Sequence, residues 1–94
     1  MPRIELYSRV DCADARAVTD WLRAEGHAHL WRDLAEPGVA DDLRCRCRLG
    51  IAPVTLVDGR PVWGTGDEQV RRLRRMLRRK RVWTLPWRAA HKAE

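Results

Sequence analysis

The sequence predicts an α/β domain in which a four-stranded mixed sheet carries helices on both faces. The first observation is the order of the elements, because the apolar periodicity changes along the chain as strand, helix, strand, helix, hairpin, helix. The second is that a strand–helix–strand unit joins parallel strands, while a hairpin adds antiparallel strands beside them. The third is length, since 94 residues give room for one domain with a single hydrophobic core.

The first half of the chain supplies two strands and two helices. Residues 3–7 alternate between apolar and polar side chains as in a strand, and residues 12–25 place apolar side chains at helical spacing. Residues 27–34 alternate again, and a proline at the start of 37–50 suits the first turn of a second helix. This order puts Cys12 in the loop after the first strand, at the strand's carboxyl end, where α/β proteins tend to form their sites.

The second half supplies a hairpin and a last helix. Residues 53–57 and 60–63 are predicted strands, and the Asp58-Gly59 dipeptide between them is typical of a two-residue hairpin turn. Asp67 is expected to N-cap the last helix, whose buried face repeats at helical spacing. Helical periodicity ends near residue 81, which predicts one domain over residues 1–81.

Residues 82–94 form a basic C-terminal tail with two tryptophans. Residues 1–70 carry a net charge of −3, from nine Lys or Arg and twelve Asp or Glu, whereas residues 71–94 carry +9, from ten Lys or Arg and one Glu. Basic and aromatic side chains together are typical of surfaces that bind nucleic acids or membranes, and they also suit an acidic protein partner. The alternative is a solvated outer face of the last helix, which is the commoner reason for such a charge run.

Cysteine usage and the absence of an apolar segment of about 20 residues favour a cytoplasmic protein without a transmembrane helix. Cys12 stands alone, and Cys45 and Cys47 form a Cys-Arg-Cys sequence. An odd number of cysteines fits reduced thiols better than a disulfide scaffold. A structural zinc site needs four ligands, and the histidines form no second cluster beside Cys-Arg-Cys, so we expect no metal.

Three segments of the chain resemble glutaredoxins. They are residues 6–12 (Leu-Tyr-Ser-Arg-Val-Asp-Cys), 51–54 (Ile-Ala-Pro-Val) and 56–64 (Leu-Val-Asp-Gly-Arg-Pro-Val-Trp-Gly). The resemblance extends over residues 3 to about 80 and implies a thioredoxin-like fold, with a cis-proline, Pro53, opposite a reactive Cys12. It also implies that Cys12 attacks a disulfide and forms a mixed disulfide with the substrate.

The chain departs from the family pattern after that cysteine. The family's usual Cys-x-x-Cys is here Cys12-Ala13-Asp14-Ala15, which lacks the second cysteine and also differs from the Cys-Gly-Phe-Ser of cluster-binding members. A tryptophan at position 63, before the last turn, resembles the corresponding position of the glutaredoxin-like hydrogen donors of ribonucleotide reductase. Those donors, however, keep both cysteines. The chain is therefore expected to be a one-cysteine variant.

The candidate site centres on Cys12. A thiolate at a helix N-terminus is stabilised by unpaired backbone N–H groups and by the helix dipole, and Arg9 is a candidate cationic neighbour. The backbone of Ala52 is expected to hold a peptide or glutathione, and the N–H groups of Thr65, Gly66 and Asp67 are expected to receive a carboxylate. The full set of candidate substrate- or thiol-binding residues is Tyr7, Ala52, Pro53, Trp63, Thr65, Gly66 and Asp67.

A second thiol is needed to release a mixed disulfide. It is glutathione or another low-molecular-weight thiol acting as co-substrate, or it is Cys47, expected late on the second helix. The alternative for Cys45 and Cys47 is that both are ordinary small apolar residues. We expect no bound cofactor.

Two functions follow from the sequence. The first is a thiol–disulfide oxidoreductase that acts through Cys12 on a disulfide-containing protein or a small thiol substrate. The alternative is a catalytically degenerate adapter domain whose basic C-terminal helix and tail bind an acidic partner.

Overall fold

A computed structural model of the protein describes residues 2–48 and 52–77. The elements follow the predicted order: β1 (Ile4–Ser8), α1 (Ala13–Ala24), β2 (Leu30–Asp33), α2 (Val39–Arg46), β3 (Val54–Val57) and β4 (Arg60–Trp63). A last helix, described over residues 66–77, follows β4. Within the described ranges, no helix has the length and apolar character needed to cross a bilayer. The predicted domain boundary at residue 81 and the tail lie outside the described residues.

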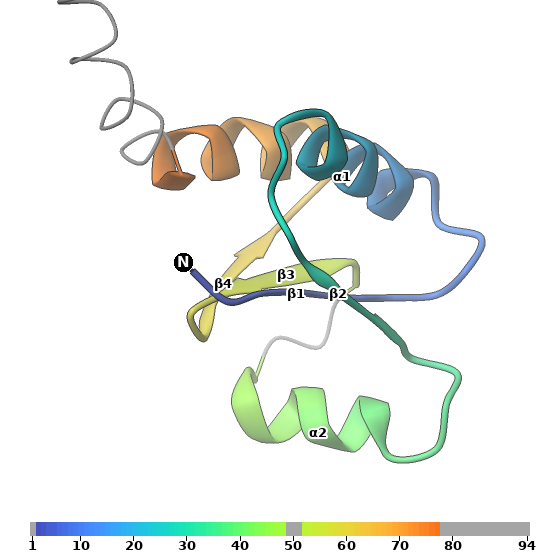
Figure 1. Ribbon diagram of the computed structural model, residues 1–94. Coiled ribbons are helices and arrows are strands. Elements are labelled where there is room, and N and C mark those ends of the chain that lie inside the picture. The colour runs from blue at the N-terminus through green and yellow to red at the C-terminus, as the bar shows by residue number, and fades with distance from the viewer. Residues whose placement is uncertain (1, 49–51, 78–94) are drawn as a thin grey trace, which may run out of the picture.

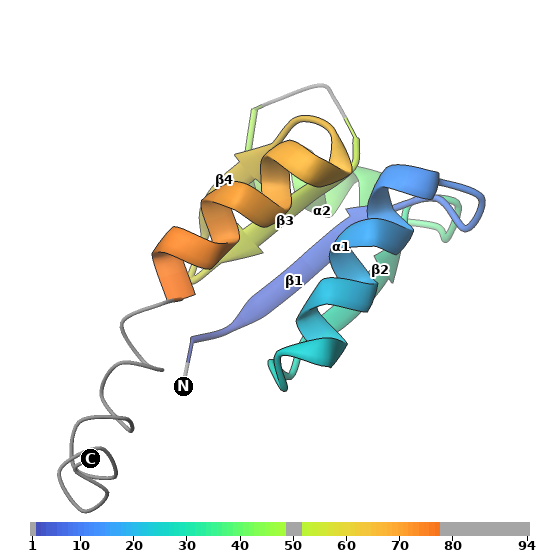
Figure 2. The same ribbon diagram turned by 90° about the horizontal axis from the view of Figure 1, so that it is seen from above.

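The four strands form one mixed sheet in the order β2-β1-β3-β4. β1 runs parallel to β2 and antiparallel to β3, and β4 is antiparallel to β3. α1 and the last helix lie side by side over one face of the sheet, and α2 covers the other (Figure 1, Figure 2). The predicted α/β class with helices on both faces is confirmed.

Each face of the sheet carries its own apolar cluster, because successive side chains of a strand point to opposite faces. The α1-face cluster consists of Ile4, Leu6, Ala15, Val18, Leu22, Val57, Val62, Leu73 and Leu77. The α2-face cluster consists of Tyr7, Val39, Leu43, Cys47, Val54 and Leu56. The sheet separates the two clusters, so a side chain of one does not reach the surface of the other.

α2 is shorter at both ends than the sequence predicts. Gly38 precedes it with a φ of 86°, a left-handed conformation, so the helix begins at Val39 and not in the turn that contains Pro37. At the other end Cys47 has extended backbone angles, with φ −153° and ψ 124°, so the helix ends at Arg46. The prediction that Cys47 lies within this helix is therefore wrong.

A charged network fastens α2 to the sheet. Glu5 of β1 is only 1% exposed, and the guanidinium of Arg46 donates to both of its carboxylate oxygens, at 2.7 and 2.8 Å. The Tyr7 hydroxyl accepts from Arg46 at 2.8 Å and donates to Asp42 at 2.9 Å. A bidentate, charge-assisted pair of this kind offsets the cost of burying a carboxylate.

Glu5→Gln is expected to lower the free energy of unfolding at neutral pH by about 2 kcal/mol, because it removes the charge-assisted hydrogen bonds to Arg46. The hydrogen bonds from Arg46 hold the pKa of Glu5 below its ordinary value of 4.5. The stability that the pair contributes is therefore fully present above that ordinary value, and it is lost as the pH falls through the lower folded-state pKa. Denaturant unfolding of both proteins between about pH 7 and about pH 3 measures the effect. A difference that does not shrink with acid would contradict it.

Candidate functional site

Three segments of the expected site meet at one edge of the sheet. Tyr7 of β1 pairs with Val54 of β3, which in turn pairs with Trp63 of β4. The loop after β1, the Ala52–Pro53 segment before β3 and the turn after β4 therefore leave the sheet at the same edge. The peptide bond between Ala52 and Pro53 is cis, as the resemblance implies.

Cys12 is the N-cap residue of α1, which is the position that the sequence predicts. Its backbone is extended, with φ −92° and ψ 114°, and its Sγ accepts a hydrogen bond from the Ala15 N–H at 3.4 Å. The side chain is half-buried. A thiolate at this position receives a backbone N–H and the positive end of the helix dipole, and both stabilise its negative charge.

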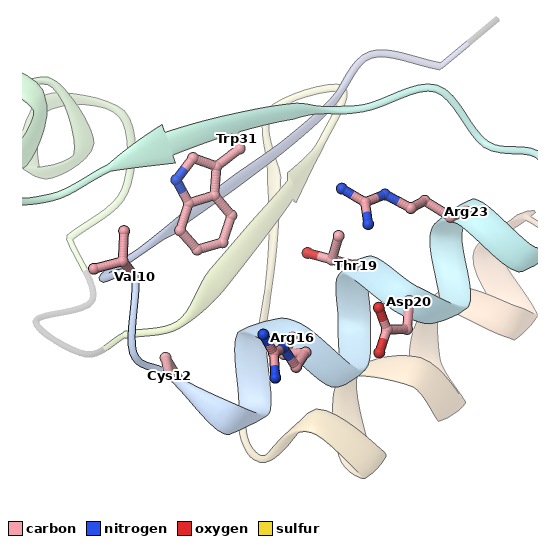
Figure 3. A pocket seen from close by; sticks show the side chains of 7 residues that line it. All are labelled: Val10, Cys12, Arg16, Thr19, Asp20, Arg23 and Trp31. Carbon is pink, nitrogen blue, oxygen red and sulfur yellow. The ribbon is translucent and has the colours of Figure 1, made fainter.

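Cys12 opens onto two adjoining hollows. The first has a volume of about 200 Å³ and runs between α1 and β2 (Figure 3). It is lined by Val10, Cys12, Arg16, Thr19, Asp20, Arg23 and Trp31. The second has a volume of about 230 Å³ and is lined by Val10, Asp11, Cys12, Ala13 and Arg16.

The cation that lines both hollows beside Cys12 is Arg16, and not the predicted Arg9. Arg9 is exposed in the loop after β1. Sequence reasoning missed Arg16, although it follows Cys12 by four residues, the spacing that places two side chains on one face of a helix. It also missed Trp31, for which there is no local signal, because this residue reaches the site from β2.

In the turn before the last helix, backbone N–H groups are already hydrogen-bonded to side chains of this chain. Thr65 donates its N–H to the Glu68 carboxylate at 2.8 Å and accepts the Glu68 N–H on its hydroxyl at 3.2 Å, which makes a capping box. Thr65 is therefore the N-cap of the last helix, and the prediction that Asp67 fills this position is wrong. The Gly66 N–H donates to Asp14 at 2.9 Å. Of the three N–H groups that were expected to receive a ligand carboxylate, those of Thr65 and Gly66 are thus already bonded, while Asp67 is exposed.

Gly66 also lies where the last helix closely approaches α1. A Cβ built on it would lie 2.9 Å from the Cβ of Ala17 and 2.9 Å from the Asp14 carbonyl oxygen. Such distances leave no space for a larger residue. We conclude that Gly66 is buried and allows α1 and the last helix to pack closely.

Ala52 and Pro53 are positioned by a residue that sequence reasoning missed, Gln69 of the last helix. Ala52 is exposed and Pro53 is buried. The Gln69 side-chain amide donates to the Pro53 carbonyl at 2.9 Å and to the Gly64 carbonyl at 3.2 Å, and its oxygen accepts from the Thr55 hydroxyl at 2.7 Å. Gln69 thereby ties the segment before β3 to the turn after β4.

Trp63 lies at the end of β4 and is partly exposed. The guanidinium of Arg72, on the last helix, lies 5.0 Å from the centroid of its ring, which is a cation–π geometry. Trp63 therefore has an apolar surface at the same edge as Cys12, although it does not line either hollow.

The chain matches no protein-family model, and no curated protein matches it. Among solved structures, it is similar to a mutant of the thioredoxin-like protein BC3987, with a TM-score of 0.71 and 24% sequence identity. The match covers 83% of this chain and 97% of that protein. The chain has a thioredoxin-like fold. The closer resemblance to glutaredoxins stays a prediction.

Within this thioredoxin-like fold, Tyr7 and Cys47 lie on the face opposite Cys12. Cys12 packs against the α1-face cluster, whereas Tyr7 and Cys47 are buried in the α2-face cluster. Burial and the hydrogen bond to Asp42 raise the pKa of Tyr7, so its hydroxyl stays neutral within the network of α2. Cys45 is exposed on α2. The structure does not bring these side chains to Cys12.

No metal-binding group adds to the site within the described residues, and only part of the basic C-terminal segment is described. Residues 2–48 and 52–77 contain no group of three or more His, Cys, Asp or Glu side chains that could hold a metal ion. The last helix exposes four arginines, Arg71, Arg72, Arg74 and Arg75. The rest of the basic segment, residues 78–94, lies outside the described part of the chain.

Proposed function

We propose that the protein exchanges thiols and disulfides through Cys12. The observation that carries this proposal is the half-buried Cys12 Sγ at the N-cap of α1, which accepts the Ala15 N–H and opens onto two hollows. Its position at the sheet edge that also holds the cis Ala52–Pro53 segment supports the proposal further. A glutaredoxin-like activity is the form of this chemistry that the sequence favours.

The exchange takes place in two balanced steps. In the first, the Cys12 thiolate attacks a disulfide, forms a mixed disulfide with one half, and expels the other half, which takes up a proton as a thiol. In the second, a thiol such as glutathione loses its proton and attacks the mixed disulfide. The Cys12 thiolate is regenerated, and a new disulfide leaves that joins the incoming thiol to the half that Cys12 had carried. The two steps together therefore release one thiol of the substrate, consume one thiol of the donor and keep the number of disulfides unchanged.

The second thiol is proposed to come from outside the chain. Cys47 is buried in the α2-face cluster, and Cys45 is exposed on α2, on the far side of the sheet from Cys12. Neither therefore lies where it can attack a mixed disulfide on Cys12. A reducing compartment such as the cytoplasm supplies low-molecular-weight thiols of the required class.

Competition between the three cysteines tests the proposal. The protein is treated with a limiting amount of iodoacetamide near neutral pH, and the alkylated peptides are quantified by mass spectrometry. Cys12 is expected to react fastest, because its thiolate is stabilised at the helix N-terminus. Cys45 is the matched internal control, since it is more exposed but lies at the end of a helix. Faster alkylation of Cys45 than of Cys12 would show that solvent exposure alone sets the alkylation rate, and it would overturn the proposal.

A further inference from the structure

The hollow between α1 and β2 has features that the exchange reaction by itself does not require. Figure 3 shows Val10 and Cys12 at one end, Arg23 toward the other, and the Trp31 ring facing α1 across the hollow. Val10 is 71% exposed and Trp31 is 36% exposed. Exposed apolar side chains that gather beside a reactive group mark a surface for a partner.

The charges of this hollow are unpaired in the described part of the chain. The described residues contain ion pairs at Arg3, Arg32, Arg44 and Arg46, but none at Arg16 or Arg23. Asp20 also lines this hollow and Asp11 lines the adjoining one, so the excess of one positive charge is confined to the hollow between α1 and β2. The buried Thr19 Oγ1 has no hydrogen-bond partner among the described residues, which leaves a polar atom of the lining unused.

On the other side of Cys12, two of the three backbone donors that were expected to hold an anion are already used. There the Thr65 and Gly66 N–H groups are bonded to Glu68 and Asp14, as described above. Among the residues that line the two hollows at Cys12, the cations without an ion pair in the described part of the chain are Arg16 and Arg23, so an acidic group that arrives with a disulfide is expected there.

We infer that this hollow docks an acidic, disulfide-bearing segment of a partner protein, with an apolar side chain of the segment against Val10 and Trp31 and a carboxylate at Arg16. A polypeptide fits better than a small thiol, because two shallow hollows meet at Cys12 and leave room for the residues on both sides of a partner cysteine. Small-molecule sites, by contrast, enclose most of their ligand. The inference rests on the proposed exchange at Cys12 and specifies its substrate.

Matched synthetic peptides test the inference on the full chain. Each carries one cysteine activated as a 2-pyridyl disulfide and flanked by Glu, Gln or Lys, and the released thiopyridone reports the rate of exchange. With the wild-type protein at low salt, the Glu peptide is expected to react faster than the Gln peptide, and the Lys peptide slowest. Arg16→Gln is expected to slow the Glu peptide about threefold, the size of one exposed ion pair. Asp20→Asn is expected to raise the rate with the Glu peptide, because it removes a negative charge that repels the glutamates of the peptide.

Two controls separate docking from general reactivity. An uncharged 2-hydroxyethyl pyridyl disulfide measures the intrinsic reactivity of Cys12 in each protein, and the rate with the Glu peptide divided by this rate is expected to fall about threefold in Arg16→Gln. Arg75→Gln removes a charge from the exposed face of the last helix and is expected to change none of the rates. Equal rates for the three peptides, with normal exchange of the uncharged disulfide, overturn the inference and leave the exchange proposal standing. No reaction with the uncharged disulfide overturns the exchange proposal and this inference with it.

Discussion

Replacing Cys12 with Ser is expected to reduce disulfide exchange to the uncatalysed rate and to leave the fold intact. A hydroxyl does not form the mixed disulfide, so the first step is lost. The fold is retained because Ser is among the best N-cap residues and keeps an acceptor for the Ala15 N–H. Reduction of a glutathionylated peptide by glutathione measures activity, and denaturant unfolding measures stability. We expect the unfolding free energies of the two proteins to agree within about 0.5 kcal/mol.

The double variant Cys45→Ser, Cys47→Ala is the control for this experiment. It is expected to keep the exchange activity, because an external thiol resolves the mixed disulfide. A graded loss of activity in the double variant would instead identify Cys47 as a resolving thiol, against its buried position on the other face of the sheet. If wild type itself shows no turnover, the adapter function becomes the better proposal, with the basic C-terminal helix and tail as the surface to test.

Gln69→Leu is expected to lower the free energy of unfolding by about 3 kcal/mol. Leu has a similar volume but makes no hydrogen bond, so the Thr55 hydroxyl and the Pro53 and Gly64 carbonyls lose their partner inside the protein. Buried polar groups without a partner are costly, because water no longer compensates for the lost bond. Denaturant unfolding gives the magnitude directly.

Thr55→Val provides a graded comparison for the Gln69 variant. It removes only the bond to the Gln69 oxygen and keeps the bonds to Pro53 and Gly64, so we expect a loss of about 1 kcal/mol. Exchange with the uncharged disulfide should fall several-fold in Gln69→Leu and little in Thr55→Val, because only the former frees the segment that contains Pro53. Equal effects of the two variants on stability would show that the bonds to the carbonyls contribute nothing.

The order of the elements and the position of Cys12 were predictable because both depend on local sequence. Apolar periodicity distinguishes strand from helix over a few residues, and the change of period after Tyr7 places Cys12 between them. The mixed sheet followed from general rules for crossovers and hairpins. Boundaries were less predictable. α2 begins two residues later than its proline indicates, because Gly38 adopts a left-handed conformation. Thr65 caps the last helix in place of Asp67, because Glu68 completes a capping box with it.

What the sequence by itself determined is that Cys12 begins a helix at the edge of a mixed sheet. Only the tertiary structure decided which groups surround it. Trp31 reaches the site from β2, and the Gly66 N–H donates a hydrogen bond to Asp14, 52 residues earlier in the chain. Cys47 is buried on the opposite face of the sheet. The physical reason is that hydrogen bonds and packing between distant residues depend on how helices and strands are stacked. Local periodicity fixes each element and the face it buries, but it does not specify which side chain of another element will lie against that face.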